Sequence, residues 1–153
     1  MIPSSWSFAV WGLDIVGPFS RAVGGYRFLY VAIDKFTKWP EATPVVNINK
    51  QSAVKFIKSI ICRFGVPNRV ITDNGSQFTS GAFQGYCEDL GIQICYASVA
   101  HPESNGQVER ANAEILKGLK TRTYDGLKKH GKKWIDELPC ALWGNRTSPS
   151  RAT

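Results

Sequence analysis

The first third of the chain carries apolar patterns that are typical of β-strands. Residues 7–16 alternate about one apolar face, residues 28–33 form a nearly continuous apolar run, and residues 39–46 follow a turn at 34–38. Gly17-Pro18 is a turn signal that ends the first of these segments. We therefore expect three consecutive antiparallel strands.

After residue 50 the apolar period changes to that of helices. Residues 50–64 place their apolar positions at helical spacing before the helix-ending Gly65-Val66-Pro67. The short segment 69–72 returns after this helix, so we expect a strand parallel to the first. A second helix is expected to end at Gly91, and residues 92–96 alternate as a fifth strand.

The rest of the chain reads as two more helices. A long helix is expected from about residue 105 to about residue 124, and a final helix from 134 to 143. The segment from 145 onward has the composition of an unfolded or truncated tail. At 153 residues the chain has room for one hydrophobic core, so residues 1–153 are expected to form a single α/β domain.

Composition excludes several classes of protein. The chain is 43% hydrophobic and 12% aromatic, which is typical of globular domains and not of disordered chains. It has no apolar stretch long enough to span a membrane, and its first residues lack the pattern of a secretory signal. The four cysteines lie far apart without metal-binding spacing, which favours reduced thiols and hence the cytosol or nucleus.

The net charge of +7 is unevenly distributed. Residues 110–133 contain eight Lys or Arg and two acidic residues, a surplus of +6, whereas residues 61–109 contain two basic and five acidic residues, a balance of −3. An acidic centre beside a basic flank suits a metal site that acts on a phosphate backbone. A solvated helix face has the same pattern, so charge alone leaves both interpretations open.

Three acidic residues occupy positions that core packing does not explain. Asp14 ends the first strand, Asp73 ends the strand expected beside it, and Glu109 lies in the first turns of the long helix. Ligands of open α/β sheets bind outside the carboxyl ends of the strands, where these side chains could converge. Phosphoryl transfer can use two divalent ions about 3.5–4 Å apart, held by carboxylates. For a single Asp at a strand end, a cap or turn remains the more common role.

The residues around these acids resemble a known family. The segments that carry the resemblance are Trp11-Gly12-Leu13-Asp14, Thr72-Asp73-Asn74-Gly75-Ser76-Gln77-Phe78 and His101-Pro102-Glu103-Ser104-Asn105-Gly106-Gln107-Val108-Glu109-Arg110. They are similar to the three signature segments of the integrase catalytic core of retroviruses and long-terminal-repeat retrotransposons, most of all the Gypsy type. Thirty-five residues separate Asp73 from Glu109, as in that family. The similarity extends from about Trp11 to Trp143.

This resemblance implies a ribonuclease-H-like fold: a mixed five-stranded sheet with helices on both faces. It also implies that Asp14, Asp73 and Glu109 are catalytic and bind two Mg²⁺ or Mn²⁺ ions. Retroviral relatives carry lysines four and seven residues after the Glu, where this chain has Ala113 and Leu116, so phosphate contacts are expected to shift to other side chains. The expected DNA-binding residues are Asn74, Asn105, Arg110, Asn112, Lys117 and Lys120.

Further expectations concern side chains that have no direct part in the chemistry. His101 is expected mainly to order its loop beside Pro102, since a metal site needs no separate base. The tryptophans Trp39, Trp134 and Trp143 are expected in core or subunit packing.

The activity implied is that of a metal-dependent DNA nucleotidyltransferase and endonuclease, which trims element ends and joins them to target DNA. The implied partners are DNA and further copies of the chain, in a homodimer or higher oligomer, with no membrane and with a nuclear location. Full-length relatives carry a zinc-binding domain before the core and a basic domain after it, and their absence suggests an excised or fragmentary core. Two alternatives remain: an inactive, domesticated descendant that binds DNA or protein, and a ribonuclease H or other nuclease, which the sequence around Asn74 and Glu109 disfavours.

Overall fold

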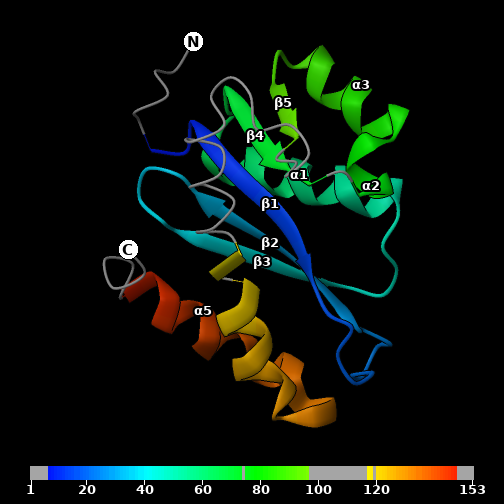
Figure 1. The fold of residues 1–153 in the computed structure, drawn as a ribbon, viewed down its shortest axis with the longest axis vertical. Helices are drawn as coiled ribbons and strands as arrows, with labels where there is room; N and C mark the ends of the chain where they lie inside the picture. The colour runs from blue at the N-terminus through cyan, green and yellow to red at the C-terminus, as the bar shows by residue number, and fades with distance from the viewer. Residues whose placement is uncertain (1–6, 74, 97–116, 119, 148–153) are drawn as a thin grey trace.

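The computed structural model describes residues 7–73, 75–96, 117–118 and 120–147. Five strands form one mixed sheet in the order β3-β2-β1-β4-β5 (Figure 1). The expected antiparallel meander of the first three strands is confirmed, and the fourth lies parallel to the first. The fifth is parallel to the fourth. The strands are β1 (Val10–Val16), β2 (Phe28–Asp34), β3 (Pro40–Val45), β4 (Arg69–Thr72) and β5 (Gln93–Tyr96).

Helix α1 (Lys50–Phe64) has the bounds expected from its pattern. Asn49 caps its start, because its side chain accepts a hydrogen bond from the Ser52 amide at 2.8 Å while the Ser52 hydroxyl accepts one from the Asn49 amide at 3.0 Å. Gly65 ends the helix with φ of +91°, a conformation that favours glycine.

The second predicted helix is confirmed as α3, and the structure adds a short helix before it. Helix α3 (Gly81–Asp89) contains the expected apolar positions, with Phe83 and Cys87 buried. A single turn, α2 (Ser76–Thr79), precedes it and was not expected. One turn is too short to show a helical period, so only its buried Phe78 could have indicated it.

The two faces of the sheet carry separate hydrophobic cores. On one face Trp11, Leu13 and Tyr30 pack with α1, α2 and α3. On the other face Val16 and Val31 pack with Leu127, Trp134 and Leu138 of the C-terminal helical segments. Figure 1 shows these two helical groups on opposite sides of the strands. The expected ribonuclease-H-like arrangement, with helices on both faces, is confirmed.

The C-terminal helices differ from the prediction in their bounds. Residues 117, 118 and 120–128 are helical, so the long helix continues beyond Tyr124. A 3₁₀ helix, η1 (Gly131–Glu137), and α5 (Leu138–Thr147) replace the single helix expected over 134–143. Pro139 lies in the first turn of α5, where its missing N–H needs no helical partner. The expected tail is also wrong in part, because residues 145–147 are helical.

Two further expectations can be compared with the described residues. Trp134 is fully buried in the second core, as expected, whereas Trp143 lies where side chains are not described. All four cysteines are free thiols, although Cys62 and Cys140 are exposed and do not pack on apolar faces. No helix in the described part of the chain is long and apolar enough to cross a membrane.

Candidate active site

The parallel pairing of β1 with β4 brings Asp14 and Asp73 to the same end of the sheet, where these two inner strands finish. Gly12 lies opposite Ile71. Asp14 follows Gly12 by two residues within β1, and Asp73 follows Ile71 by two residues, directly after β4. A step of two residues returns a side chain to the same face, and neighbouring strands are about 4.8 Å apart. Burial is the main cause of the raised pKa of Asp14, and the nearby charge of Asp73 raises it further. The structure therefore brings the two carboxylates together, as expected.

Asp14 lies in a largely buried position on β1. The strand continues to Val16, so Asp14 does not end it as expected. Its side chain is 17% exposed, and its Oδ1 accepts a hydrogen bond from the Ile15 amide at 2.7 Å. Burial raises the pKa of Asp14 above its ordinary value, while the Ile15 hydrogen bond and the Lys120 charge oppose that increase.

Lys120 reaches this carboxylate from the long helix. Its Nζ lies 3.7 Å from Oδ1 of Asp14, and the Lys120 side chain is 42% exposed. The even-numbered positions of β1 face this helix, because Val16 packs in the same core as Leu127. Helix and strand therefore place one cation beside one buried carboxylate.

Asp73 has a more open position. It follows β4 directly and is exposed, and its Oδ1 accepts a hydrogen bond from the Gly75 amide at 2.9 Å. This short turn directs the chain into α2. Asp73 thus combines a hydrogen bond within its turn with an exposed position.

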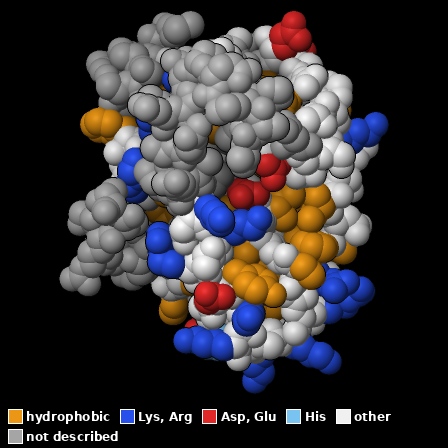
Figure 2. All heavy atoms as spheres, viewed as in Figure 1, with side chains coloured by type: hydrophobic (Ala, Val, Ile, Leu, Met, Phe, Trp, Pro, Cys, Tyr) orange, Lys and Arg blue, Asp and Glu red, His pale blue; other side chains and the backbone are white. Residues whose placement is uncertain are grey.

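A pocket of about 430 Å³ lies beside Asp14. Gly17 forms part of its wall with φ of +135°, and a Cβ atom there would lie 2.9 Å from the Arg27 carbonyl oxygen, so a side chain cannot replace it without strain. Figure 2 shows acidic and basic side chains close together near the middle of this face. The pocket is lined by Asp14, Val16, Gly17, Lys117, Lys120, Thr121, Tyr124 and Asp125.

The other residues expected at the site have a mixed outcome. Lys117 and Lys120 both line the pocket with Asp14. The remaining expected residues lie outside the described part of the chain: Asn74, His101, Asn105, Glu109, Arg110 and Asn112. Their place relative to the two aspartates stays a prediction.

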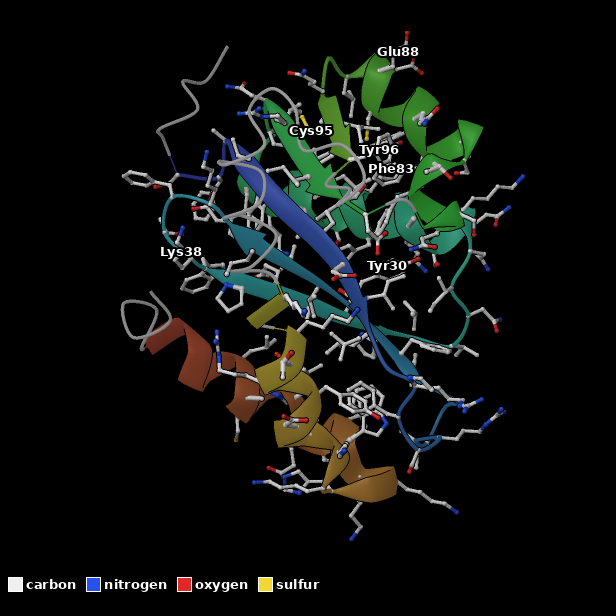
Figure 3. The ribbon with its side chains drawn as sticks, viewed as in Figure 1. Tyr30, Lys38, Phe83, Glu88, Cys95 and Tyr96 are labelled. Carbon is white, nitrogen blue, oxygen red and sulfur yellow. The ribbon has the colours of Figure 1, made fainter. Side chains whose placement is uncertain are left out.

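Sequence reasoning missed Tyr96. Its hydroxyl donates to the Phe78 carbonyl oxygen at 2.9 Å and accepts from the Gln84 side-chain amide at 2.8 Å. Figure 3 shows Tyr96 at β5, beside Phe83 of α3. Tyr96 therefore ties the end of β5 to the turn that follows Asp73. Its strand alternation gave no sign of this role, because the bond joins residues 18 apart in sequence.

The described donors suit a hard divalent cation. Asp14 and Asp73 offer carboxylate oxygens, the ligand type that Mg²⁺ and Mn²⁺ prefer. Two carboxylates at one sheet edge, one of them largely buried, repel each other in a way that a divalent cation would relieve. Among the described residues no group of three His, Cys, Asp or Glu side chains gathers, and Glu109, the expected third ligand, lies outside them.

Comparison with known proteins decides the family. The sequence profile of the integrase core domain matches residues 6–102. The chain belongs to this family. The integrase core is 37% identical over 134 residues to the Gag-Pol polyprotein of avian reticuloendotheliosis virus, and 37% identical over 128 residues to that of koala retrovirus. These alignments cover 85% and 83% of the chain but only 11% and 7% of the polyproteins.

Solved structures show the same fold for this integrase core. A chain of the simian T-cell lymphotropic virus intasome, in complex with the PP2A regulatory subunit B56 gamma, aligns with a TM-score of 0.62 and 28% identity, covering 89% of this chain and 47% of that one. The catalytic core domain of BIV integrase aligns with a TM-score of 0.60 and 23% identity, covering 88% and 81%. The expected fold class is therefore confirmed.

Proposed function

We propose that this integrase core is a metal-dependent polynucleotidyl transferase that processes the ends of an element's DNA and joins them to target DNA. The observation that carries the proposal is the parallel register that brings Asp14 and Asp73 to one sheet edge, with Lys120 beside Asp14. Glu109, which 35 residues separate from Asp73, completes the proposed set of catalytic acids.

The proposed chemistry consists of two phosphoryl transfers. In end processing, a water oxygen attacks a phosphorus atom near the end of the element, the bond to the adjoining 3′ oxygen breaks, and that oxygen takes a proton. In strand transfer, the new 3′ hydroxyl attacks a target phosphodiester and releases its proton. A P–O bond forms to the attacking oxygen, the P–O bond to the target's 3′ oxygen breaks, and that leaving oxygen takes up a proton. The phosphodiester count is unchanged in strand transfer, so it needs no external energy source.

Asp14, Asp73 and Glu109 would hold two Mg²⁺ or Mn²⁺ ions. Bound there, such ions supply Lewis-acid stabilisation of the charge that develops on the attacking and leaving oxygens. The largely buried position of Asp14 fixes one ligand, while the exposed Asp73 leaves room for a substrate phosphate. Lys117 and Lys120 line the pocket and would contact DNA phosphates. We include Asn74, Asn105, Arg110 and Asn112 in the same DNA-contacting set.

The proposal extends to partners and location. DNA is the substrate, and the core works as a homodimer or higher oligomer, because joining both ends of an element requires two active sites. Chromosomal target DNA implies action in the nucleus.

A disintegration assay with Mn²⁺ tests this function, since it requires only one branched DNA substrate. Wild type is expected to release the element arm and reseal the target strand. Asp73→Asn removes one anionic ligand and is expected to lower the rate at least about a hundredfold, as loss of a main electrostatic contribution does. The variant keeps the side-chain oxygen that accepts from Gly75, so its fold is expected to persist.

Asp89→Asn is the matched control, because Asp89 is an exposed acid at the end of α3, in the layer on the other face of the sheet. It should resolve the branched DNA at the wild-type rate. A folded wild type without activity would support the inactive, domesticated alternative, and an Asp73→Asn variant that retains full activity would remove Asp73 from the site.

A further inference from the structure

A second basic surface lies away from the Asp14 pocket. It consists of Lys128, Lys129, Lys132, Lys133 and Arg21, all exposed, and is called the lysine platform below. Residues 128–135 contain no acidic side chain. Figure 2 shows Lys and Arg side chains gathered over the lower part of the face, where Figure 1 places the C-terminal helical segments and the β1-β2 loop.

The platform is built by tertiary structure. Trp134 is fully buried, its ring stacks on Phe19 at 4.2 Å, and its indole Nε1 donates to the Ser20 carbonyl oxygen at 2.8 Å. This bond joins the segment before Arg21 to the segment after Lys133, 114 residues apart. The backbone segments that carry these basic side chains are therefore held by core packing around Trp134.

Local helix electrostatics explains only part of this charge. Lys128 and Lys129 lie at the C-terminal end of the helix over 120–128, where positive charge is favourable. Lys132 and Lys133, by contrast, lie in the first turn of η1, where positive charge is unfavourable. Neither forms an ion pair within the part of the chain that the structure describes. Helix electrostatics and ion pairs among the described residues therefore do not account for these two lysines.

The long helix sets the distance between the platform and the candidate active site. Lys120 lies beside Asp14, and Lys128 follows eight residues later in continuous helix, about 12 Å along the axis. Duplex DNA advances about 3.4 Å per base pair, so this distance corresponds to roughly four base pairs. A duplex whose reacting phosphate lies at Asp14 can thus reach the platform with its flank.

We propose that the lysine platform binds the phosphate backbone of the duplex that flanks the reacting phosphate, at least about four base pairs from it. The proposal rests on the proposed function and adds a separate contact surface to it. The platform clamps DNA without reading its sequence, because lysines on phosphates carry no base information.

Binding isotherms at several salt concentrations test the platform, with DNA hairpin stems of about 3 and about 20 base pairs as the two probes. The double variant Lys132→Ala, Lys133→Ala should flatten the dependence of log K on log salt by about two units on the long stem. On the short stem, which cannot span both surfaces, the slope should stay at its wild-type value. Arg21→Ala should flatten the long-stem slope by about one unit.

The matched control is Lys50→Ala, Lys55→Ala. These two lysines are exposed on α1, which covers the opposite face of the sheet, and their loss changes the net charge equally. The control should keep the wild-type slope on both stems. All variants change exposed side chains, so melting temperatures should match that of wild type.

Several outcomes would overturn the proposal. One is an unchanged long-stem slope in the platform variant, and another is an equal loss in the control, which would show an effect of net charge alone. Equal loss on both stems would place the lysines at the reacting phosphate. Weaker binding to polyglutamate without any change on DNA would assign the surface to an acidic protein. Disintegration by wild type is measured separately, so failure of the proposed function is distinguishable from failure of the platform.

Discussion

Lys120 Nζ lies 3.7 Å from Asp14 Oδ1, across the boundary between the long helix and the sheet. In the absence of metal, this ammonium group is the cation beside the largely buried carboxylate, and it opposes the rise in the Asp14 pKa caused by burial. A divalent cation that binds Asp14 must share the carboxylate with Lys120 or displace its ammonium group.

Replacing Lys120 with Met should therefore strengthen metal binding. If the ammonium weakens Mn²⁺ affinity about tenfold, excess Mn²⁺ should stabilise the variant by about 1.4 kcal/mol more than wild type. For a chain of this size that is about 3–5 °C in melting temperature. Without metal, the variant should be less stable by at most about 1 kcal/mol, because the pair is partly exposed.

Lys117→Met is the control for this experiment. Lys117 lines the same pocket, but its ammonium forms no ion pair with Asp14 among the described contacts. Its response to Mn²⁺ should resemble that of wild type. An equal response in both variants would mean that general pocket charge, and not the Asp14 contact, controls metal affinity.

Tyr96→Phe should impair catalysis more than its stability loss explains. The variant keeps the ring and loses two hydrogen bonds, to Phe78 and from Gln84, at a cost of about 1 kcal/mol. Since α2 follows directly after Asp73, we expect the turn that carries Asp73 to become less fixed. In a disintegration assay the maximal rate should fall several-fold while the DNA concentration for half-maximal rate stays constant.

Asn49→Ala provides a variant with a similar stability cost away from the site. Loss of the capping side chain of α1 should cost about 1 kcal/mol, or about 2–4 °C in melting temperature. Thermal unfolding measures this directly, and the disintegration rate should remain at the wild-type value. If Asn49→Ala slowed the reaction as much as Tyr96→Phe, the effect of Tyr96 would be one of general stability.

Cys87 should make the folded state less stable at high pH. Burial raises the pKa of its thiol to about 11 from 9.0. Between these values the unfolded chain loses a proton that the folded chain keeps, so stability falls as pH rises from about 9 to about 11. Melting curves across this range should fall more steeply for wild type than for Cys87→Ala, in which this titration is absent.

Thiol labelling gives an independent check on the cysteines. Cys62 and Cys140 are exposed and Cys87 is fully buried, so a small alkylating reagent at pH 8 should modify the first two in the folded protein. Cys87 should react only after denaturant is added. Rapid reaction of Cys87 under native conditions would contradict its packing in the core of α1 and α3.

Much of the fold could be predicted because its signals are local. Helix α1 has a cap at Asn49, a helical apolar period and a terminating Gly65, so its bounds agreed with the prediction. The return of β4 beside β1 followed from the intervening helix, and this placed Asp14 near Asp73. Helix α2 and the division into η1 and α5 were missed, because one turn and a 3₁₀ segment carry no long period.

The contacts of the site were harder to predict than its elements. The approach of Lys120 to Asp14 spans 106 positions and depends on how the long helix packs on the sheet. The bonds of Tyr96 depend on an unexpected turn at α2. Glu109 could be proposed from its motif, but its place lies outside the described residues. Sequence patterns thus indicated which residues belong to the candidate site. Most contacts of those residues depend on tertiary packing and could not be predicted.

The two hydrophobic cores on opposite faces of the sheet stabilise different parts of the site. Asp14 lies on β1, which both cores hold in place, and Asp73 directly follows β4, which packs in the first core. Lys120 belongs to the helical layer that packs on the sheet through residues such as Leu127 and Trp134. Amide exchange can detect a sub-global opening of that layer. Such an opening would move the Lys120 ammonium group away from Asp14 and leave the Asp14 and Asp73 carboxylates beside each other. Asp14 and Asp73 therefore keep their positions when the C-terminal layer opens, whereas Lys120 does not.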